Sequence, residues 1–218
     1  MTTDAALTAR RSRFGAVLPA IWYDRDTRVV ARALLGTVLE CRTEEGIASG
    51  RIVETEAYLG GDDPACHAAV GLTERNRHLH GPPGIAYVYR IYGAHWCFNA
   101  VTEPAGKGSA VLVRALEPLV GIEIMRRRRP AARRDIDLTS GPGKLCAALG
   151  IVGAHDGLPL QRPPLVIRAG TPVPDDAVEV TPRIGITRAA EWPLRFLVRD
   201  NPWVSRTPGH FFRRPFEG

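Results

Sequence analysis

Stretches in which apolar and polar residues alternate recur along the chain and predict β-strands, because successive side chains of a strand point to opposite faces. Turn-forming residues separate several of these stretches at short distances, which is typical of hairpins. The strands expected from this pattern are 37–43, 48–58, 85–92, 96–102, 109–116, 164–168, 180–187 and 194–199.

Three further stretches have the spacing of amphipathic helices. Residues 27–36 begin at a threonine, which can cap a helix, and end at a glycine. The other two are 118–129 and 140–150, and the second opens on Ser-Gly-Pro, where proline suits the first helical turn. Residues 59–84 are rich in loop-forming residues. Hairpins in succession with helices at their flanks predict an α+β domain on an antiparallel sheet and not a βαβ array.

The overall composition is that of a globular protein, with 218 residues of which 44% are hydrophobic and 24% charged. No apolar run is long enough to span a membrane, and the first residues lack the apolar core of a secretory signal. We therefore expect a cytoplasmic protein, associated with the nucleoid if the source is bacterial. Residues 1–18 are short of large apolar side chains and are expected to be disordered.

The formal net charge is +6, and the 29 basic residues include only two lysines, Lys107 and Lys144. A positive charge is compatible with a polyanionic partner such as DNA but does not identify one, because many basic proteins bind no nucleic acid. The run from Arg126 to Arg129 is typical of a solvated helix end. It could contact phosphates, but it specifies no chemistry.

The chain has four cysteines, Cys41, Cys66, Cys97 and Cys146. They are far apart and include no Cys-x-x-Cys pair, so neither a disulfide framework nor a zinc ribbon is expected. His78 and His80 lie close together, but no His-x-x-x-His or carboxylate-rich motif accompanies them. We expect free cysteines, no metal and no cofactor.

Glu54, Glu56 and Tyr58 are two residues apart on the strand expected at 48–58, and they therefore share one of its faces. Charged groups beside an aromatic side chain are ordinary on a solvent-exposed face. The strand is otherwise apolar enough to be central, where a carboxylate beside an aromatic ring could hold a flat ligand and activate water next to it. Both interpretations stay open on this strand alone.

Aromatic side chains gather on the next expected hairpin. Tyr87 and Tyr89 share one face of its first strand, and Tyr92 stands at the turn. A tyrosine at a hairpin tip has little to pack against in its own domain and can insert into a partner. Asn99 lies in an otherwise apolar strand, where it either satisfies backbone groups or contacts the edge of a ligand.

Several segments match one family in the same order along the chain: ARALLG (31–36), GRIVETEAYLG (50–60), TERNR (73–77), AYVYRIYG (86–93), LVRALEPL (112–119), SGPGKL (140–145) and PLRFLVRDNPWVS (193–205), together with Asn99. On these segments the chain resembles the alkyladenine (3-methyladenine) DNA glycosylase family. The resemblance implies a single mixed domain around a curved antiparallel sheet with flanking helices. It makes residues 19–208 the glycosylase catalytic domain and 209–218 a C-terminal tail.

The resemblance also implies catalytic roles. Glu56 would be the general base that deprotonates the attacking water, and Arg114 and the main-chain carbonyl of Ile184 would help to place that water. Lys144 stands at the start of an expected helix, where contact with a DNA phosphate is expected. Two further residues of the matching segments are expected to contact the DNA backbone, Arg75 and Arg77.

The same resemblance implies a pocket for the damaged base. Tyr58, His67 and Tyr89 would form the walls that hold a flipped base, with His67 also bonding to the purine edge. Tyr92 would be inserted into the gap in the duplex. Asn99 would exclude guanine by clashing with its 2-amino group.

The implied reaction removes a damaged purine from double-stranded DNA and leaves an abasic site. The nucleotide must be flipped out, since a stacked base is out of reach. The expected lesions are 3-methyladenine, 7-methylguanine, hypoxanthine and 1,N6-ethenoadenine, which the sequence does not rank. We expect a monomer that acts without a cofactor. We expect no strand cleavage, because neither lysine nor the N-terminal amine is placed to form a Schiff base.

Two other functions can be weighed against this one. A DNA-binding module that senses lesions without cutting would need the tip tyrosine and a basic face, but neither Glu56 nor Arg114, so their joint presence argues against it. A zinc-dependent base deaminase also flips bases, but the sequence lacks its His-x-Glu and Pro-Cys-x-x-Cys motifs.

Overall fold

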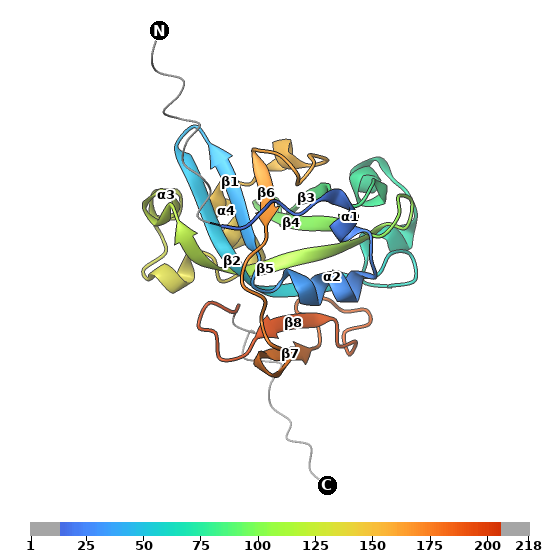
Figure 1. The fold of residues 1–218 in the computed structure, drawn as a ribbon. Coiled ribbons are helices and arrows are strands. Elements are labelled where there is room, and N and C mark those ends of the chain that lie inside the picture. The colour runs from blue at the N-terminus through green and yellow to red at the C-terminus, as the bar shows by residue number, and fades with distance from the viewer. Residues whose placement is uncertain (1–13, 206–218) are drawn as a thin grey trace.

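Eight strands make up one antiparallel sheet in the computed structural model, which describes residues 14–205. The strands are β1 (Val38–Thr43), β2 (Gly46–Tyr58), β3 (Ala86–Ile91), β4 (His95–Thr102), β5 (Ser109–Val120), β6 (Leu165–Arg168), β7 (Val178–Thr181) and β8 (Arg195–Val198). They follow the order β3-β4-β5-β2-β1-β6, with β8 added beside β2 and β7 beside β8 (Figure 1). The predicted α+β domain on an antiparallel sheet is confirmed.

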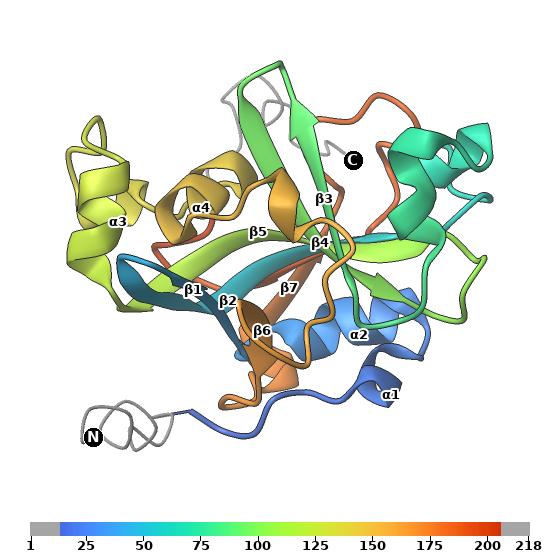
Figure 2. The same cartoon turned by 90° about the horizontal axis from the view of Figure 1, so that it is seen from above.

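Short helices connect and cover the strands. The α-helices are α1 (Ala20–Tyr23), α2 (Thr27–Leu34), α3 (Ile122–Arg128) and α4 (Pro142–Leu149). The 3-10 helices are η1 (His67–Val70), η2 (Glu74–His80), η3 (Asp135–Asp137), η4 (Gly153–His155) and η5 (Asp175–Ala177). Figure 2 shows the β3–β4 hairpin standing at a steep angle to β1, β2 and β5, so the sheet is strongly curved. No helix within residues 14–205 is long and apolar enough to cross a membrane.

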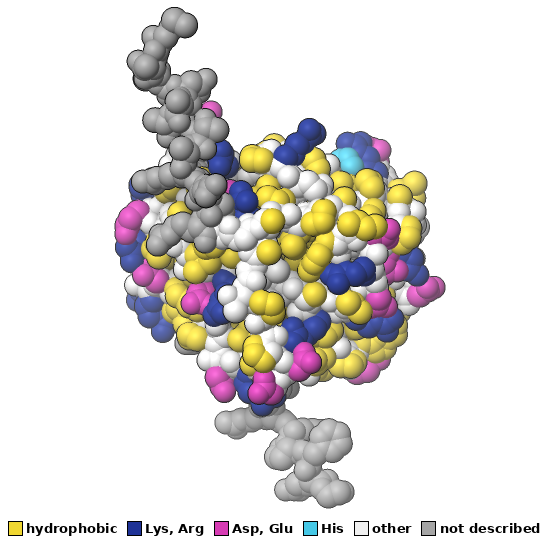
Figure 3. Space-filling view, in the orientation of Figure 1, with side chains coloured by type: hydrophobic (Ala, Val, Ile, Leu, Met, Phe, Trp, Pro, Cys, Tyr) yellow, Lys and Arg dark blue, Asp and Glu magenta, His cyan; other side chains and the backbone are white. Residues whose placement is uncertain are grey.

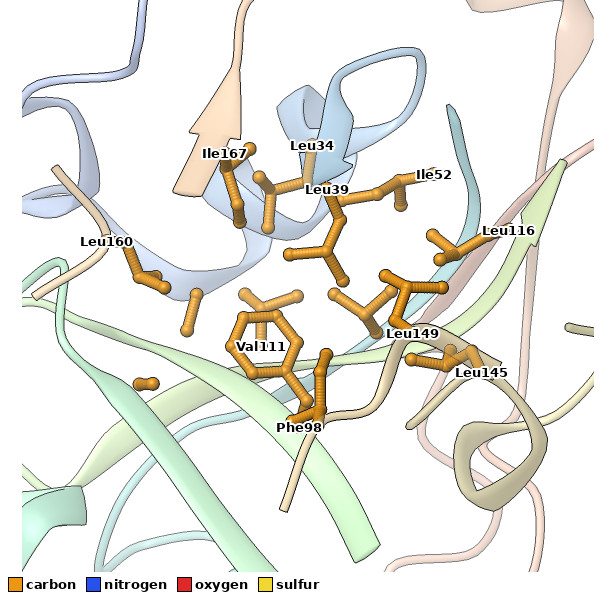
Figure 4. Close-up of a cluster of buried hydrophobic side chains, with 14 of the residues drawn as sticks. Leu34, Leu39, Ile52, Phe98, Val111, Leu116, Leu145, Leu149, Leu160 and Ile167 are labelled. Atoms are coloured by element: carbon orange, nitrogen blue, oxygen red, sulfur yellow. The ribbon is translucent and has the colours of Figure 1, made fainter. Parts of the chain in front are cut away.

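The main hydrophobic core lies between the curved sheet and the helices α2 and α4 (Figure 4). Leu34 of α2 and Leu145 and Leu149 of α4 are fully buried there, together with Leu39 of β1 and Phe98 of β4. Each such side chain contributes about 1.5–3 kcal/mol when it is removed from water. This core fixes one face of β4 and β5 and leaves their other face available for a site.

A second, smaller cluster covers that other face. Tyr87 of β3, Val101 of β4 and Ala110 of β5 pack there against Cys66 and Leu79, which come from the segment between β2 and β3. The neighbours of these strand residues in sequence point into the main core, as strand periodicity requires. The segment 59–84, expected to be a loop, therefore carries the 3-10 helices η1 and η2 and forms a wall over the sheet.

Several predicted boundaries are wrong. Residues 118–120 continue β5 rather than begin a helix, and α3 starts only after Gly121. Gly121 has a φ of +76°, and a Cβ at this position would lie 2.4 Å from the carbonyl oxygen of Ile47. Only glycine fits this close approach, so the chain turns sharply between strand and helix at a point where the sequence pattern predicted continuous helix.

Two other segments differ from expectation. Residues 182–187 do not continue β7, which ends at Thr181, and they form irregular chain. Residues 14–18 were expected to be disordered, but the N–H of Gly15 donates to Ala169 O at 3.1 Å and Val17 pairs with Arg168. Edge pairing with β6 orders this short stretch. Residues 1–13, 206–208 and the expected C-terminal tail lie outside the described residues.

Candidate active site

A fully buried carboxylate, Glu56, lies near the end of the central strand β2. The N–H of Ile184 donates to its Oε1 at 2.7 Å, and the hydroxyl of Tyr58 donates to its Oε2 at 3.0 Å. The Nη1 of Arg114 lies 3.2 Å from Oε1. Three donors thus hold a carboxylate that burial alone would disfavour. The interpretation of this strand face as solvent-exposed is wrong.

The second carboxylate of the strand, Glu54, is also fully buried and accepts several hydrogen bonds. Its Oε1 accepts from Arg114 Nε at 3.0 Å, from Arg195 Nε at 2.7 Å and from Ser205 Oγ at 2.7 Å. Its Oε2 accepts from the N–H of Ser205 at 2.6 Å. Glu54 therefore fixes Arg114 from the side opposite Glu56, a role that the sequence did not indicate.

Two irregularities in the β2–β5 ladder help to aim these groups. The register shifts on both sides of Glu54, so that Val53 of β2 and Arg114 of β5 have no direct partner across the ladder. Bulges of this kind bend a strand and re-aim its side chains, and they are frequent beside active sites. Here the unpaired residue of β5 is the arginine that contacts both carboxylates.

A cavity of about 340 Å³ opens beside this cluster and is rich in aromatic side chains. Its lining includes Tyr58, His67, Tyr89 and Asn99, which the resemblance placed in a base pocket, and Tyr92, which it assigned to insertion into the duplex. It also includes Arg114 and Ile184, two of the groups that contact Glu56. The structure thus gathers residues from β2, η1, β3, β4, β5 and the irregular chain after β7 around one hollow.

Three aromatic rings form one side of this cavity. The Nδ1 of His67 lies 2.8 Å from the hydroxyl of Tyr87, and the ring centroids of His67 and Tyr89 are 4.5 Å apart. Packing against these rings, together with the positive charge of Arg75, lowers the pKa of His67 below its usual value. The imidazole is therefore neutral at pH 7. Tyr87 is a lining residue to which the sequence gave no role in the pocket.

The hydroxyl of Tyr58 stays protonated. Burial and the neighbouring charge of Glu56 raise its pKa well above the usual value. It can therefore donate its proton to the Glu56 carboxylate at neutral pH, as the 3.0 Å contact requires. On the same cavity, the Nδ2 of Asn99 donates to Tyr87 O at 3.0 Å, which fixes the orientation of a side chain that is 4% exposed.

Tyr92 stands at the tip of the β3–β4 hairpin and is 89% exposed. It has a φ of +49° and Gly93 a φ of +68°, and the N–H of Ala94 donates to Ile91 O at 3.1 Å. Left-handed values at both central positions are those of a type I′ turn, which favours asparagine, aspartate or glycine. A tyrosine here carries a local conformational cost and is available to a partner.

A buried ion pair that the sequence did not indicate lies behind Tyr58. Arg183 and Asp63 are both fully buried and meet through two hydrogen bonds, at 2.5 and 2.8 Å. The guanidinium carbon of Arg183 lies 4.6 Å from the centre of the Tyr58 ring. Burial would raise the pKa of Asp63, but hydrogen bonds from Arg183 and from two backbone N–H groups lower it overall.

The three basic residues expected at the DNA backbone do not line the cavity. Arg75 lines a neighbouring hollow and donates to Arg90 O at 3.3 Å, whereas Arg77 is paired with Glu74. Lys144, at the start of α4, lines another hollow on the far side of Ile184. Figure 3 shows basic side chains scattered among acidic ones on one face, so charge alone does not mark a surface.

The two closely spaced histidines, His78 and His80, contact other protein groups. His78 Nδ1 bonds to Asp156 Oδ2 at 2.7 Å, and His80 Nδ1 lies 3.3 Å from Gly106 O. Within residues 14–205, no three His, Cys, Asp or Glu side chains group in a way that could hold a metal ion. The four cysteines are buried and unpaired.

A sequence model of the methylpurine-DNA glycosylase family matches residues 21–202. The chain belongs to the methylpurine-DNA glycosylase family. The resemblance seen in the sequence is confirmed, and this methylpurine-DNA glycosylase is a hydrolase of N-glycosyl bonds whose substrate is DNA.

Relatives of this methylpurine-DNA glycosylase match nearly their whole length. A Myxococcus xanthus protein named "Putative 3-methyladenine DNA glycosylase" is 49% identical over 201 residues, covering 91% of this chain and 98% of its own. A Methanoculleus marisnigri protein of the same name is 51% identical over 192 residues, covering 87% and 98%. Similarity of this extent places the buried carboxylates and the aromatic cavity within the shared domain.

Proposed function

We propose that this glycosylase flips alkylated or deaminated purines out of duplex DNA, binds them in the aromatic cavity and hydrolyses the glycosidic bond with water activated by Glu56. One observation carries the proposal. The three groups that contact the Glu56 carboxylate, namely Tyr58, Arg114 and Ile184, all line the same cavity. A base held there would have its glycosidic bond beside a carboxylate.

The chemistry of Glu56 fits a general base. Its carboxylate is positioned by fixed donors, and it would accept a proton from water as the bond between C1′ and the purine breaks. Arg114 neutralises the buried charge without taking up the proton, because a guanidinium stays protonated at physiological pH. The sequence resemblance assigned the carbonyl of Ile184 to the water, and the N–H of the same residue donates to Glu56. Ile184 could therefore orient both the Glu56 carboxylate, through its N–H, and the attacking water, through its carbonyl.

The cavity suits a purine that carries positive charge. Tyr58 and Tyr89 offer ring faces, to which a cationic alkylpurine is attracted more strongly than a neutral base. His67 is neutral and does not repel such a base. Asn99 projects into the cavity from β4 and would meet the 2-amino group of guanine. The attraction to positive charge supports 3-methyladenine and 7-methylguanine as candidate substrates, and the absence of a 2-amino group supports hypoxanthine and 1,N6-ethenoadenine.

Flipping a base costs a few kcal/mol of lost stacking and pairing. Tyr92 could recover part of this cost by filling the vacated space, since it is exposed at the tip of a hairpin on the rim of the cavity. Basic residues flank the same rim, with Arg75 on one side and Lys144 on the other. They could bind phosphates on either side of the flipped nucleotide.

The direct test is release of free base from duplexes that each carry one of the four lesions, under single-turnover conditions. Release from at least one lesion duplex, with none from an undamaged duplex, is expected. No release from any of them, by protein that binds DNA, would favour the lesion-sensing alternative.

A second arm of this test asks whether the enzyme also cuts the strand. Lys107 lies 3.7 Å from Asp62, and Lys144 stands beside Ser140 rather than next to Glu56. We therefore expect hydrolysis by water and no Schiff base. Treatment with borohydride during the reaction should trap no covalent adduct, whereas an adduct that forms as fast as the base is released would contradict hydrolysis by water.

A further inference from the structure

The buried ion pair of Arg183 and Asp63 lies outside the cavity, behind the Tyr58 ring. Both side chains are fully buried, and neither residue lines the cavity. A buried ion pair gains little net stability over apolar residues of the same volume, because desolvation offsets the attraction. Its position therefore calls for an explanation in terms of what it holds in place.

On one side the pair supports Tyr58. The guanidinium of Arg183 packs over the Tyr58 ring at 4.6 Å, and its Nη1 donates to Ala57 O at 3.0 Å. Its Nε has no hydrogen-bond partner among residues 14–205. Arg183 thus supports the tyrosine from behind, while the tyrosine presents itself to the cavity.

On the other side the pair organises the loop that leads to His67. Each carboxylate oxygen of Asp63 accepts one bond from Arg183 and one from the backbone, from Leu59 N at 3.2 Å and from Ala65 N at 3.0 Å. This loop begins directly after Tyr58 and ends two residues after Ala65, at His67. The spacing between two walls of the cavity is therefore tied to one ion pair.

The same arginine also reaches the carboxylate cluster. Arg183 directly precedes Ile184, whose N–H donates to Glu56. A shift of the guanidinium would move this donor as well as the Tyr58 ring.

We propose that Arg183 and Asp63 are positioning residues that set the width of the base-binding slot and its alignment with Glu56. The proposal rests on the proposed function, because it assumes that a base enters the cavity. The pair is electrically neutral as a whole, so it acts by geometry rather than by a field on the substrate. A misplacement of about 1 Å can cost roughly a hundredfold in rate, which makes a slot-setting pair important for catalysis.

The test uses the double variant Arg183→Gln/Asp63→Asn, which keeps polar groups in place and removes both charges. We expect single-turnover base release to fall about tenfold or more, and a smaller change in ethenoadenine fluorescence on binding, because that change reports stacking of the base. Affinity for undamaged duplex should stay within about twofold, since the exposed basic residues are untouched. The single variant Arg183→Lys should also lose release, because lysine keeps the charge but lacks the planar fork that packs on Tyr58 and binds Asp63 twice.

A matched control separates this effect from general destabilisation. Glu40 and Arg168 form another largely buried pair, at 3.0 Å, between β1 and β6 and away from the cavity. Glu40→Gln/Arg168→Gln should lower the melting temperature without changing the rate of base release. If the Arg183 double variant does not fold, Arg183→Lys decides by the same measurements.

Folded Arg183 variants with wild-type release and fluorescence would overturn the proposal. Absence of release in the wild-type enzyme would instead contradict the proposed function, so the two failures are distinguishable.

Discussion

The guanidinium of Arg114 donates from Nε to the carboxylate of Glu54 at 3.0 Å, and both side chains are almost completely buried. The same guanidinium reaches Glu56 through Nη1 at 3.2 Å. Two acidic residues on one strand face thus have different surroundings. Glu54 accepts further hydrogen bonds from Arg195 and Ser205, whereas the groups that contact Glu56 line the cavity.

Glu56→Gln should keep lesion binding and lose base release. The amide preserves the shape of the side chain but cannot accept the proton of water, and loss of a general base costs on the order of a hundredfold or more. Single-turnover release and gel-shift affinity, measured on the same lesion duplex, check both parts. A variant that releases base at the wild-type rate would show that another group activates the water.

Glu54→Gln should slow release and destabilise the fold. The neutral amide pairs more weakly with Arg114 and Arg195, so the guanidinium of Arg114 is held less firmly beside Glu56. Breaking a buried ion pair should also cost about 3–5 kcal/mol in a urea melt. Single-turnover release and the urea midpoint measure the two effects, and wild-type values of both would contradict this arrangement.

Tyr92→Ser should weaken lesion binding and slow excision, because the flipped state loses its plug. The effect in a paired duplex should be roughly tenfold or more, as part of a cost of a few kcal/mol is no longer recovered. A smaller effect is expected where the lesion lies opposite a mismatch, since less pairing must be broken. Ile21→Ser, at a comparably exposed position on α1, is the control. Equal losses in both duplexes would make Tyr92 a structural residue.

Asn99→Ser should relax the exclusion of undamaged guanine. The shorter side chain removes bulk beside the position of the 2-amino group, so guanine excision should rise relative to hypoxanthine excision. The ratio of the two rates is the quantity to measure, because it cancels any general loss of activity. An unchanged ratio would place the discriminator elsewhere in the cavity.

The imidazole of His67 should titrate below its usual pKa of about 6.5. The neutral form therefore stays in the majority as the pH falls from 7 to 6.5, and excision of cationic 7-methylguanine should persist over that range. Arg75→Gln should raise the midpoint in a histidine NMR titration, because it removes a nearby positive charge. Arg77→Gln, where the guanidinium is paired with Glu74, should leave the midpoint unchanged. A His67 midpoint above 6.5 would contradict the assignment.

Local patterns predicted the strands well, because alternation along β3 and β4 requires only the sequence of each strand. They failed where the tertiary structure decides. The end of β5 at Gly121 depends on a close approach to Ile47, and the pairing of Arg183 with Asp63 joins residues far apart in the chain. The sequence placed the aromatic residues in one pocket through resemblance, and the structure brings them together. Their roles in binding and catalysis stay predictions.

The bulges at Val53 and Arg114 belong to the register of β2 against β5, and this register decides where Glu56 points. A strand that slips by one residue turns every side chain to the opposite face, so a chain folded in the wrong register would point Glu56 away from the cavity and bury a charge among apolar groups. Such a molecule would be unstable. The register that gives Glu56 its three donors is therefore the same register that gathers the lining of the cavity.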